Sequence, residues 1–369
     1  YKAMTINKSA VLNALSYVDD PDLGKDLVTL KMVDNIKIDG KKVSFRLILT
    51  TPACPMKDQI KNACITAIKH LVDKEAEVSV EITSKVTSHR QDNGKILPNV
   101  KNIIAVASGK GGVGKSTVAV NLAVALAKQG AKVGIIDADI YGPSIPLMFQ
   151  LDGQRPKVQN VNGKSRIIPI EKYGVKTLSI GFLTDPKQAI VWRGPMASSA
   201  LRQFVTDTAW GELDYMLIDL PPGTGDIHLT LVQTVPVTAA VIVTTPQAVA
   251  QADAIKALEM FKMPNINVPI LGVVENMSYF TPPELPNNRY YLFGKDGGRR
   301  LADTYDVPLL AQLPIVEAVR NGGDTGKPIV LEEKTLISMV FMQFAETTAR
   351  NVAIRNANFA KTTVVNMKS

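Results

Sequence analysis

Gly-Lys-Gly-Gly-Val-Gly-Lys-Ser-Thr, residues 109–117, follows the apolar run Ile103–Ser108 and opens a helical pattern over Ser116–Lys128. Its glycines let the backbone turn N–H groups toward phosphate oxygens, and the helix behind them presents the positive end of its dipole. The spacing satisfies Gly-x-x-x-x-Gly-Lys-Ser in the strand, loop and helix context that this motif requires. The stretch therefore predicts a phosphate-binding loop of the kind that holds ATP.

Two lysines in the loop have different expected roles. Lys115 is expected to contact the β- and γ-phosphates, and the Ser116 hydroxyl to complete the coordination of Mg²⁺. Lys110 is an additional lysine inside the loop itself. The loop residues predicted to bind nucleotide are Gly109, Lys110, Gly111, Gly112, Val113, Gly114, Lys115, Ser116 and Thr117.

Carboxylates follow two later strand patterns. The run Lys132–Asp137 continues into Asp139, and the run Asp214–Asp219 continues into Leu-Pro-Pro-Gly-Thr-Gly-Asp. Because ligands of open α/β sheets bind at the carboxyl ends of the strands, these side chains are expected beside the nucleotide. Asp219 is predicted in the outer shell of Mg²⁺, with a plain turn role as its alternative. For Asp139 the alternative is a capping role.

Strand and helix patterns alternate from Asn102 onward, and several strands are continuous apolar runs. This alternation predicts an α/β fold with a doubly wound, mostly parallel sheet. Residues 1–85 form a separate small α/β pattern, and the polar stretch 86–101 contains Gly94 and Pro98. The predicted domains are therefore a small α/β domain at 1–85, a linker at 86–101 and the P-loop domain at 102–369.

Composition excludes several classes. The chain has 369 residues, of which 46% are hydrophobic and 21% charged, values typical of a folded globular protein rather than a disordered one. Two cysteines are too few for a disulfide framework or for a four-thiolate metal site within one chain. The net charge of +8 is spread along the chain, so it gives no strong nucleic-acid signal. With no long apolar run, we expect a cytoplasmic protein without a membrane span.

The second lysine, Lys110, resembles the signature of the deviant P-loop family, which includes the nitrogenase iron protein and the partition and division-site ATPases. The resemblance implies a homodimer that encloses ATP, with Lys110 reaching the partner's nucleotide. It assigns Lys110, Lys115 and Asp139 to catalysis, Asp139 by orienting or deprotonating the attacking water. Asn276, in Val-Val-Glu-Asn-Met-Ser, is similar to the family's adenine-reading asparagine. A turn role is its alternative.

Three further motifs resemble the Mrp/ApbC-type iron–sulfur cluster carriers. They are Asp-Ile-Tyr-Gly-Pro-Ser at 139–144, Trp-Arg-Gly-Pro-Met at 192–196, and Asp-Leu-Pro-Pro-Gly-Thr-Gly-Asp at 219–226. In addition, Thr-Thr-Pro-Ala-Cys-Pro-Met at 50–56 is similar to the core of the small domain that accompanies iron–sulfur assembly proteins. The resemblance implies slow ATP hydrolysis coupled to iron–sulfur protein maturation, with assembly factors or apo-protein clients as partners.

One departure from that family concerns the cluster. The family's Cys-x-x-Cys pair, which holds a [4Fe–4S] cluster between two subunits, is replaced here by Thr281 and Glu284. Neither residue supplies the soft thiolate that such clusters prefer, so the usual bridging cluster is not expected. Cys54 precedes a predicted helix whose positive end would lower its pKa, which makes it a candidate thiolate or cluster ligand. A small half-buried residue is the alternative, and Cys64 is expected in the core.

The leading hypothesis is a nucleotide-gated carrier or scaffold for iron–sulfur clusters. The missing thiols favour one alternative, an ATP-binding adaptor that carries no cluster. A second alternative is a positional ATPase that binds DNA or a membrane, for which the mixed sequence after Ala353 gives no clear signal. His228, just after the glycine-containing loop, is expected to have a structural or switch role rather than to bind metal.

Overall fold

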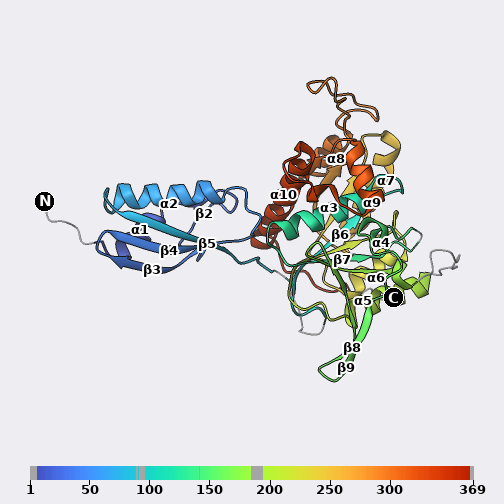
Figure 1. Cartoon of the computed structure of the whole chain (residues 1–369), viewed down its shortest axis with the longest axis horizontal. Helices are drawn as coiled ribbons and strands as arrows, with labels where there is room; N and C mark the ends of the chain where they lie inside the picture. Colours follow the sequence, from blue (N-terminus) through green and yellow to red (C-terminus); the bar gives the residue numbers. More distant parts are fainter. Residues whose placement is uncertain (1–5, 89, 91–95, 141, 184–193, 366–369) are drawn as a thin grey trace. The chain divides into compact units, whose positions relative to one another are not determined.

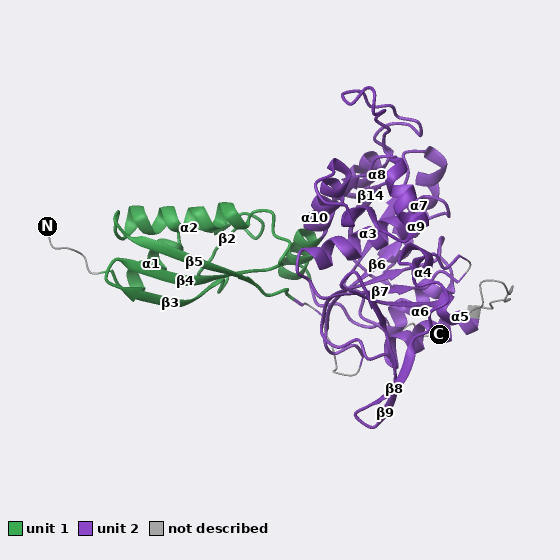
Figure 2. Ribbon diagram, in the orientation of Figure 1, with its two compact units in different colours: residues 1–87, 349–359 green, residues 88–348, 360–369 purple. Residues whose placement is uncertain are grey.

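The computed structural model describes residues 6–88, 90, 96–140, 142–183 and 194–365 (Figure 1). The chain divides into two compact units (Figure 2). Unit 1 comprises residues 1–87 and 349–359, and unit 2 comprises residues 88–348 and 360–369. The last helix therefore contributes residues to both units. The predicted domains at 1–85 and 102–369 and the linker at 86–101 stay predictions.

Unit 1 is a three-stranded sheet packed on two helices. β3 (Val33–Asp39) pairs antiparallel with β4 (Lys42–Leu49), and β4 pairs parallel with β5 (Glu77–Ser84). Alternate residues of β4 are buried, as expected for a sheet with one covered face. The helices are α1 (Lys8–Leu15) and α2 (Lys57–Leu71), and two short strands, β1 (Asp19–Asp20) and β2 (Lys25–Asp26), pair beside them.

Unit 2 is built on an eight-stranded sheet in the order β10-β11-β7-β12-β6-β13-β14-β15. All neighbours are parallel except β10 and β11. The strands are β6 (Val100–Ala107), β7 (Val133–Asp137), β10 (Ile170–Lys172), β11 (Val175–Ser179), β12 (Leu213–Asp219), β13 (Ala239–Thr244), β14 (Ile270–Glu275) and β15 (Leu309–Gln312). The predicted doubly wound, mostly parallel sheet is confirmed.

Helices cover the sheet of unit 2. The first, α3 (Lys115–Lys128), packs against β7 and β12, and every residue from Val118 to Leu126 is buried. The others are α4 (Ile145–Met148), α5 (Gly194–Thr206), α6 (Asp226–Thr234), α7 (Ala248–Lys262), α8 (Gly297–Tyr305), α9 (Glu317–Thr325) and α10 (Leu336–Asn358), with 3₁₀ turns η1 (Ile180–Leu183) and η2 (Ile329–Leu331). None of the described helices is long and apolar enough to span a membrane.

A hairpin of β8 (Lys157–Val161) and β9 (Lys164–Ile168) extends beyond the main sheet of unit 2 (Figure 1). The sequence analysis did not predict it. Its base is attached to the unit by two backbone hydrogen bonds, from Ile167 N–H to the Asp207 carbonyl and from Ala209 N–H to the Ile167 carbonyl, both 2.9 Å long.

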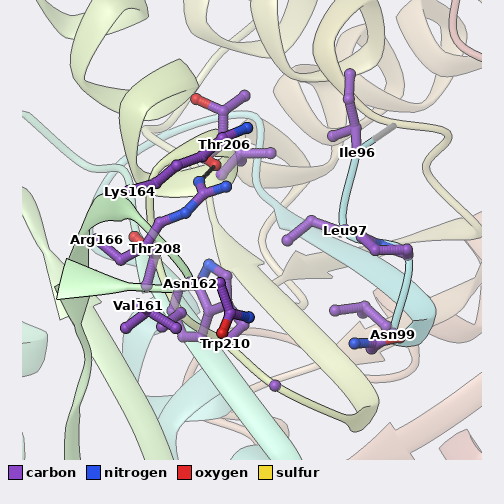
Figure 3. A pocket seen from close by; sticks show the side chains of 15 residues that line it. Ile96, Leu97, Asn99, Val161, Asn162, Lys164, Arg166, Thr206, Thr208 and Trp210 are labelled. Atoms are coloured by element: carbon purple, nitrogen blue, oxygen red, sulfur yellow. Dashed lines mark hydrogen bonds between the residues drawn. The ribbon is translucent and has the colours of Figure 1, made fainter. Parts of the chain in front are cut away.

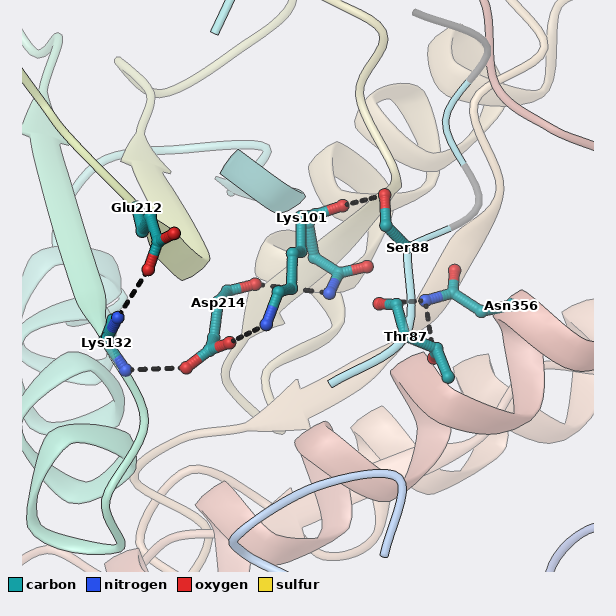
Figure 4. A network of polar contacts seen from close by, with 8 residues as sticks. Thr87, Ser88, Lys101, Lys132, Glu212, Asp214 and Asn356 are labelled. Atoms are coloured by element: carbon teal, nitrogen blue, oxygen red, sulfur yellow. Dashed lines mark hydrogen bonds and ion pairs between the residues drawn. The ribbon is translucent and has the colours of Figure 1, made fainter. Parts of the chain in front are cut away.

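Ionic contacts join three strands at the amino end of the sheet (Figure 4). Asp214 accepts from the Lys101 ammonium at 2.7 Å and from the backbone N–H of Lys132 at 2.9 Å. The Lys132 ammonium pairs in turn with Glu212 at 2.7 Å. Lys132 and Glu212 are largely exposed, whereas the Asp214 side chain is 13% exposed. The exposed pair aligns the strand ends more than it stabilises the fold. The opposite, carboxyl end of the sheet holds the predicted site.

Candidate functional site

The phosphate loop joins β6 to α3, as the motif requires. Gly112 and Gly114 have φ angles of +81° and +79°, a region that side chains other than glycine rarely adopt. Gly109 is required for a different reason, since a Cβ there would lie 2.0 Å from the carbonyl carbon of Asp253 on α7. The glycines therefore serve both loop conformation and close packing of the loop on α7.

The strand register aligns the carboxylates of the site. Ser179 on β11 is paired with Asp137 on β7, which is paired with Asp219 on β12. Asp219 is also paired with Val106 of β6, the last strand residue but one before the phosphate loop. Parallel pairing thus brings side chains from four separate strands to one edge, directly beside the loop.

Lys115 lies at the centre of this arrangement. Its ammonium is 2.6 Å from Asp219 Oδ1 and 3.7 Å from Asp139 Oδ2, and it donates to Ser116 Oγ at 3.3 Å. The Lys115 side chain is only 6% exposed and that of Asp219 is inaccessible. A buried lysine needs such a partner because desolvation of an unpaired charge is costly.

Asp137 lies one strand further along and has different partners. Its Oδ2 accepts hydrogen bonds from Ser179 Oγ at 2.9 Å and from Ile145 N–H at 3.2 Å, and its Oδ1 accepts from Asp139 N–H at 3.2 Å. Complete burial, together with the nearby charge of Asp219, raises the pKa of Asp137 to about 7. Asp137 thus organises the loop after β7 and carries less charge than an exposed carboxylate.

The residues present fit a magnesium ion. Burial raises the pKa of Asp219, and the positive charge of Lys115 opposes that change. Asp219 Oδ2 is buried, and among the described residues it has no hydrogen-bond partner. An unpaired buried carboxylate oxygen beside the Ser116 hydroxyl is suited to a hydrated cation, because hard cations prefer oxygen ligands. Among the described residues no cluster of three His, Cys, Asp or Glu side chains forms a further metal site.

The loop from Asp219 to α6 is tied to the phosphate loop. The Gly223 N–H donates to the Ser108 carbonyl at 2.8 Å, and Gly223 itself has a φ of +93°. Gly225 then caps the start of α6. His228, on the first turn of that helix, is buried, and neither ring nitrogen has a hydrogen-bond partner among the described residues. Burial lowers the pKa of His228 to about 4, so its ring is neutral.

Asn276 also meets the phosphate loop. Its Nδ2 donates to the Val113 carbonyl at 2.9 Å, and a Cβ on Gly114 would lie 2.2 Å from that nitrogen. Lys110, by contrast, is partly exposed, and among the described residues its ammonium forms no ion pair. The structure therefore brings Lys115, Ser116, Asp139, Asp219 and Asn276 together around one loop, and Lys110 takes no part in these contacts.

Two buried residues of this edge were missed by sequence reasoning. Ser179 ends β11 and is paired with Asp137 at the end of β7. The parallel pairing of two apolar strand patterns could have indicated this position. Glu275 is fully buried next to Asn276, and its carboxylate accepts from Ser278 Oγ, the Gly298 N–H and Gln312 Nε2. Glu275 thereby holds the segment that carries Asn276, and no motif in the sequence marks it.

The expectation for Cys54 was wrong in one respect. The sequence predicted that the following helix would lower the pKa of its thiol. Instead, the pKa of this half-buried thiol is raised, mainly by burial and further by the Asp22 and Asp20 carboxylates. Cys64 lies in the core of unit 1, as predicted, and burial raises its pKa to about 12. Thr281 is partly buried and Glu284 exposed. Of the family motifs, Tyr141, Trp192 and Arg193 lie outside the described residues.

The fold and this site define a nucleotide-binding protein of the P-loop NTPase class. The model of the ParA family described as "NUBPL iron-transfer P-loop NTPase" matches residues 99–350, and that of the iron-sulfur cluster assembly protein family matches residues 8–81. The chain belongs to the NUBPL iron-transfer P-loop NTPase family, and its sequence resemblance to the cluster carriers is confirmed.

Named relatives agree with this assignment. The chain is similar to an iron-sulfur cluster carrier protein of Synechocystis sp., with 49% identity covering 89% of this chain and 92% of that protein. It is also similar to the Fe-S cluster assembly factor HCF101 of rice, with 45% identity covering 88% of this chain and 60% of that protein. Among solved structures, it resembles a nucleotide-binding protein from Archaeoglobus fulgidus in complex with ADP, at 42% identity and a TM-score of 0.55, covering 64% of this chain and 90% of that one.

Proposed function

We propose that this protein binds and hydrolyses ATP with Mg²⁺ and acts as a carrier or scaffold in iron–sulfur protein maturation. The observation that carries the nucleotide part is the buried pair of Lys115 and Asp219 beside a glycine-rich loop. The similarity to iron-sulfur cluster carrier proteins over most of the chain carries the maturation part.

Nucleotide binding would exchange the partner of Lys115. The β- and γ-phosphates offer the ammonium more negative charge than a single carboxylate, so Lys115 would turn from Asp219 toward them. Asp219 would then hold magnesium-bound water, and the Ser116 hydroxyl would contact the ion. Magnesium would neutralise charge on the phosphate oxygens when it is bound.

Hydrolysis would use few chemical groups. Asp139, whose carboxylate lies at the open edge 3.7 Å from Lys115, would orient the attacking water. The partial exposure of Lys110 supports a role in trans, in which it reaches the nucleotide of a second copy in a homodimer. Positioning and charge neutralisation would supply most of the rate enhancement.

The state of the nucleotide would be transmitted through the loop at Gly223. Its N–H is bonded to the Ser108 carbonyl at the start of the phosphate loop, and its positive φ lets the loop rearrange at low steric cost. A shift of this loop on γ-phosphate loss would move α6, which begins at Asp226. Such a movement would switch the dimer between states that accept and release a cluster or client.

Thr281 and Glu284, at the position of the family's cysteine pair, favour a second candidate, a cluster-free ATPase adaptor in the same process. The carrier proposal instead requires Cys54, which is the more accessible of the two thiols. Counting the iron that the protein takes up separates the two candidates.

Two lysine variants test the ATPase proposal. Lys115→Ala should abolish nucleotide binding and turnover, because the group that faces the phosphates is removed. Lys110→Ala should keep ATP binding and lose most hydrolysis, if this lysine acts on the partner's nucleotide. Equilibrium binding of a fluorescent ATP analogue and phosphate release measure the two properties separately. Retained turnover in Lys115→Ala would refute the assignment of the site.

A further inference from the structure

Unit 2 contains a cavity of about 460 Å³ that lies away from the nucleotide site (Figure 3). It lies at the amino end of the sheet, where Asn99 and Val100 begin β6 and Gly211 precedes β12. The phosphate loop follows the other end of β6. Seven residue steps separate Val100 from Ala107, which corresponds to about 23 Å at roughly 3.3 Å per residue. The two sites are therefore separate.

Both walls of the cavity are attached to the sheet. One wall is β9 of the projecting hairpin, which is bonded through Ile167 to the segment 207–209. The other is the segment 96–100, where the Asn99 carbonyl accepts from the Leu213 N–H at 2.9 Å. Figure 3 shows Lys164, Arg166 and Trp210 on one side of the space and Ile96, Leu97 and Asn99 on the other. The cavity is a formed site and not a gap between loose loops.

The charged groups of the lining have one sign. Lys164 and Arg166, both from β9, line the cavity, and no Asp or Glu is among its described lining residues. Two carboxylates adjoin lining residues in the sequence: Asp207 accepts a hydrogen bond from Thr206 Oγ1 at 3.0 Å, and Glu212 pairs with the Lys132 ammonium at 2.7 Å. One N–H of Arg166 donates to the Thr206 carbonyl, which holds the guanidinium in place. Its remaining donors suit an oxyanion, since arginine binds carboxylate and phosphate with two parallel bonds.

A buried hydroxyl lies in the same lining. Thr208 is 8% exposed, and its Oγ1 has no hydrogen-bond partner among the described residues. An oxygen this enclosed is out of reach of a water-sized molecule in the cavity, so Thr208 forms a fixed part of the wall and not a contact for a ligand.

Part of the remaining lining is apolar, beside the polar Asn99, Asn162 and Thr206. Trp210 is buried, and its indole N–H donates to the Phe204 carbonyl at 2.9 Å, so the ring is fixed beside the cavity. Val161, Val205 and Leu97 complete this part of the surface. Sites of this size with a few convergent polar groups and an apolar wall typically bind small organic molecules.

We propose that this cavity is a second ligand site, which binds a small organic anion by placing its carboxylate or phosphate group between Lys164 and Arg166 and its apolar body against Ile96 and Val161. The site is independent of the proposed ATPase and carrier functions. It requires only unit 2.

Intrinsic fluorescence of Trp210 tests the proposal. The chain has two tryptophans, so Trp192→Phe leaves Trp210 as the single indole fluorophore. The probes are phenylacetate and phenyl phosphate, with the neutral 2-phenylacetamide as the comparison. Saturating Mg·ADP is present throughout, so that phenyl phosphate does not report on the phosphate loop. The two anions should shift the Trp210 emission in a saturable manner, and the amide should bind at least about tenfold more weakly.

Substitutions in the same background locate the site. Lys164→Gln and Arg166→Gln should each weaken anion binding, Lys164→Gln by about tenfold, while Lys157→Gln on β8 is the matched control and should bind like the parent. Thermal unfolding midpoints confirm that each variant is folded. The proposal is overturned if neither anion is bound at ~10 mM, ten times a dissociation constant of about 1 mM. It is overturned equally if the amide binds as tightly, or if Lys164→Gln and Arg166→Gln leave binding unchanged.

Discussion

The Lys115 ammonium lies 2.6 Å from Asp219 Oδ1, and both side chains are almost completely inaccessible to water. The lysine that is expected to bind phosphate is thus held by the carboxylate that is expected to serve magnesium. The two charges compensate each other, and a nucleotide with its metal ion would take over both roles.

Removing one partner of this pair should cost more than removing both. Lys115→Met leaves Asp219 buried without its counter-charge, which should lower the free energy of unfolding by about 3 kcal/mol. In the double variant with Asp219→Asn, much of that loss should be recovered, because the uncompensated charge is gone. Urea unfolding of the nucleotide-free variants measures both values. Additive losses in the double variant would show that the pair is not coupled.

Two glycines of the phosphate loop should respond differently to alanine. A Cβ on Gly109 would lie 2.0 Å from backbone of α7, so Gly109→Ala should destabilise unit 2 by about 1–3 kcal/mol through overpacking. Gly111→Ala is the matched control, because its Cβ would meet only Pro222 Cγ at 3.9 Å. Differential scanning calorimetry without nucleotide compares them. Equal melting temperatures for the two variants would contradict the close packing of loop and helix.

Asp137 should make the protein less stable as pH rises from about 4 to about 7. Its pKa is about 7 in the folded chain against an ordinary value of 3.8, so in this range the folded state binds the proton that the unfolded state has lost. Stability then falls with pH, by at most about 1.4 kcal/mol per pH unit for one proton. Asp137→Asn, which carries no titrating proton, should lack this contribution. Urea unfolding across this range measures the free energy of unfolding of both proteins. As pH rises toward 7, this free energy should fall in wild type relative to the variant. A difference that does not change with pH would contradict the raised pKa.

The effect of His228 on stability should have the opposite pH dependence to that of Asp137. Its pKa is about 4 in the folded chain against 6.5 ordinarily, so below about pH 6.5 the unfolded state takes up a proton that the folded state does not. Its contribution to stability is therefore complete above pH 6.5 and is lost as pH falls toward 4. His228→Leu should remove this acid destabilisation while keeping the packing against Phe261, whose ring centroid is 6.4 Å away. NMR titration of the His228 ring gives an independent check, and a pKa near 6.5 would contradict its burial in a neutral form.

Local motifs predicted which residues the fold brings together around the phosphate loop, because these residues lie on one short segment and at strand ends. Strand, loop and helix around Gly109 follow from glycine spacing, and the carboxylates at 137, 139 and 219 follow from where parallel strands end. Cys54 was interpreted wrongly because its pKa depends on burial and on Asp20 and Asp22, which are distant in sequence. Glu275 was missed for the same reason, since its three partners come from separate segments.

The β8–β9 hairpin was missed although it carries a recognised signal. Asn162 and Gly163 join the two strands with φ angles of +53° and +79°, the conformation that an Asn-Gly hairpin turn adopts. The two strands are mostly exposed, and their apolar residues, Val158 and Val161 on β8 and Ile167 and Ile168 on β9, do not alternate with polar ones as they usually do in a strand. Turn chemistry would have indicated the hairpin where periodicity could not.

The central claim, that this protein carries an iron–sulfur cluster under the control of ATP, is tested most directly by anaerobic reconstitution with iron and sulfide counted per chain. Cys54 is the more accessible thiol and Cys64 is enclosed in the core, so folded Cys64→Ala protein serves as the matched control. We predict that wild type and Cys64→Ala take up iron and sulfide in equal amounts and that Cys54→Ala takes up neither. A wild-type protein that binds Mg·ATP but retains no iron would contradict the claim and identify the cluster-free adaptor.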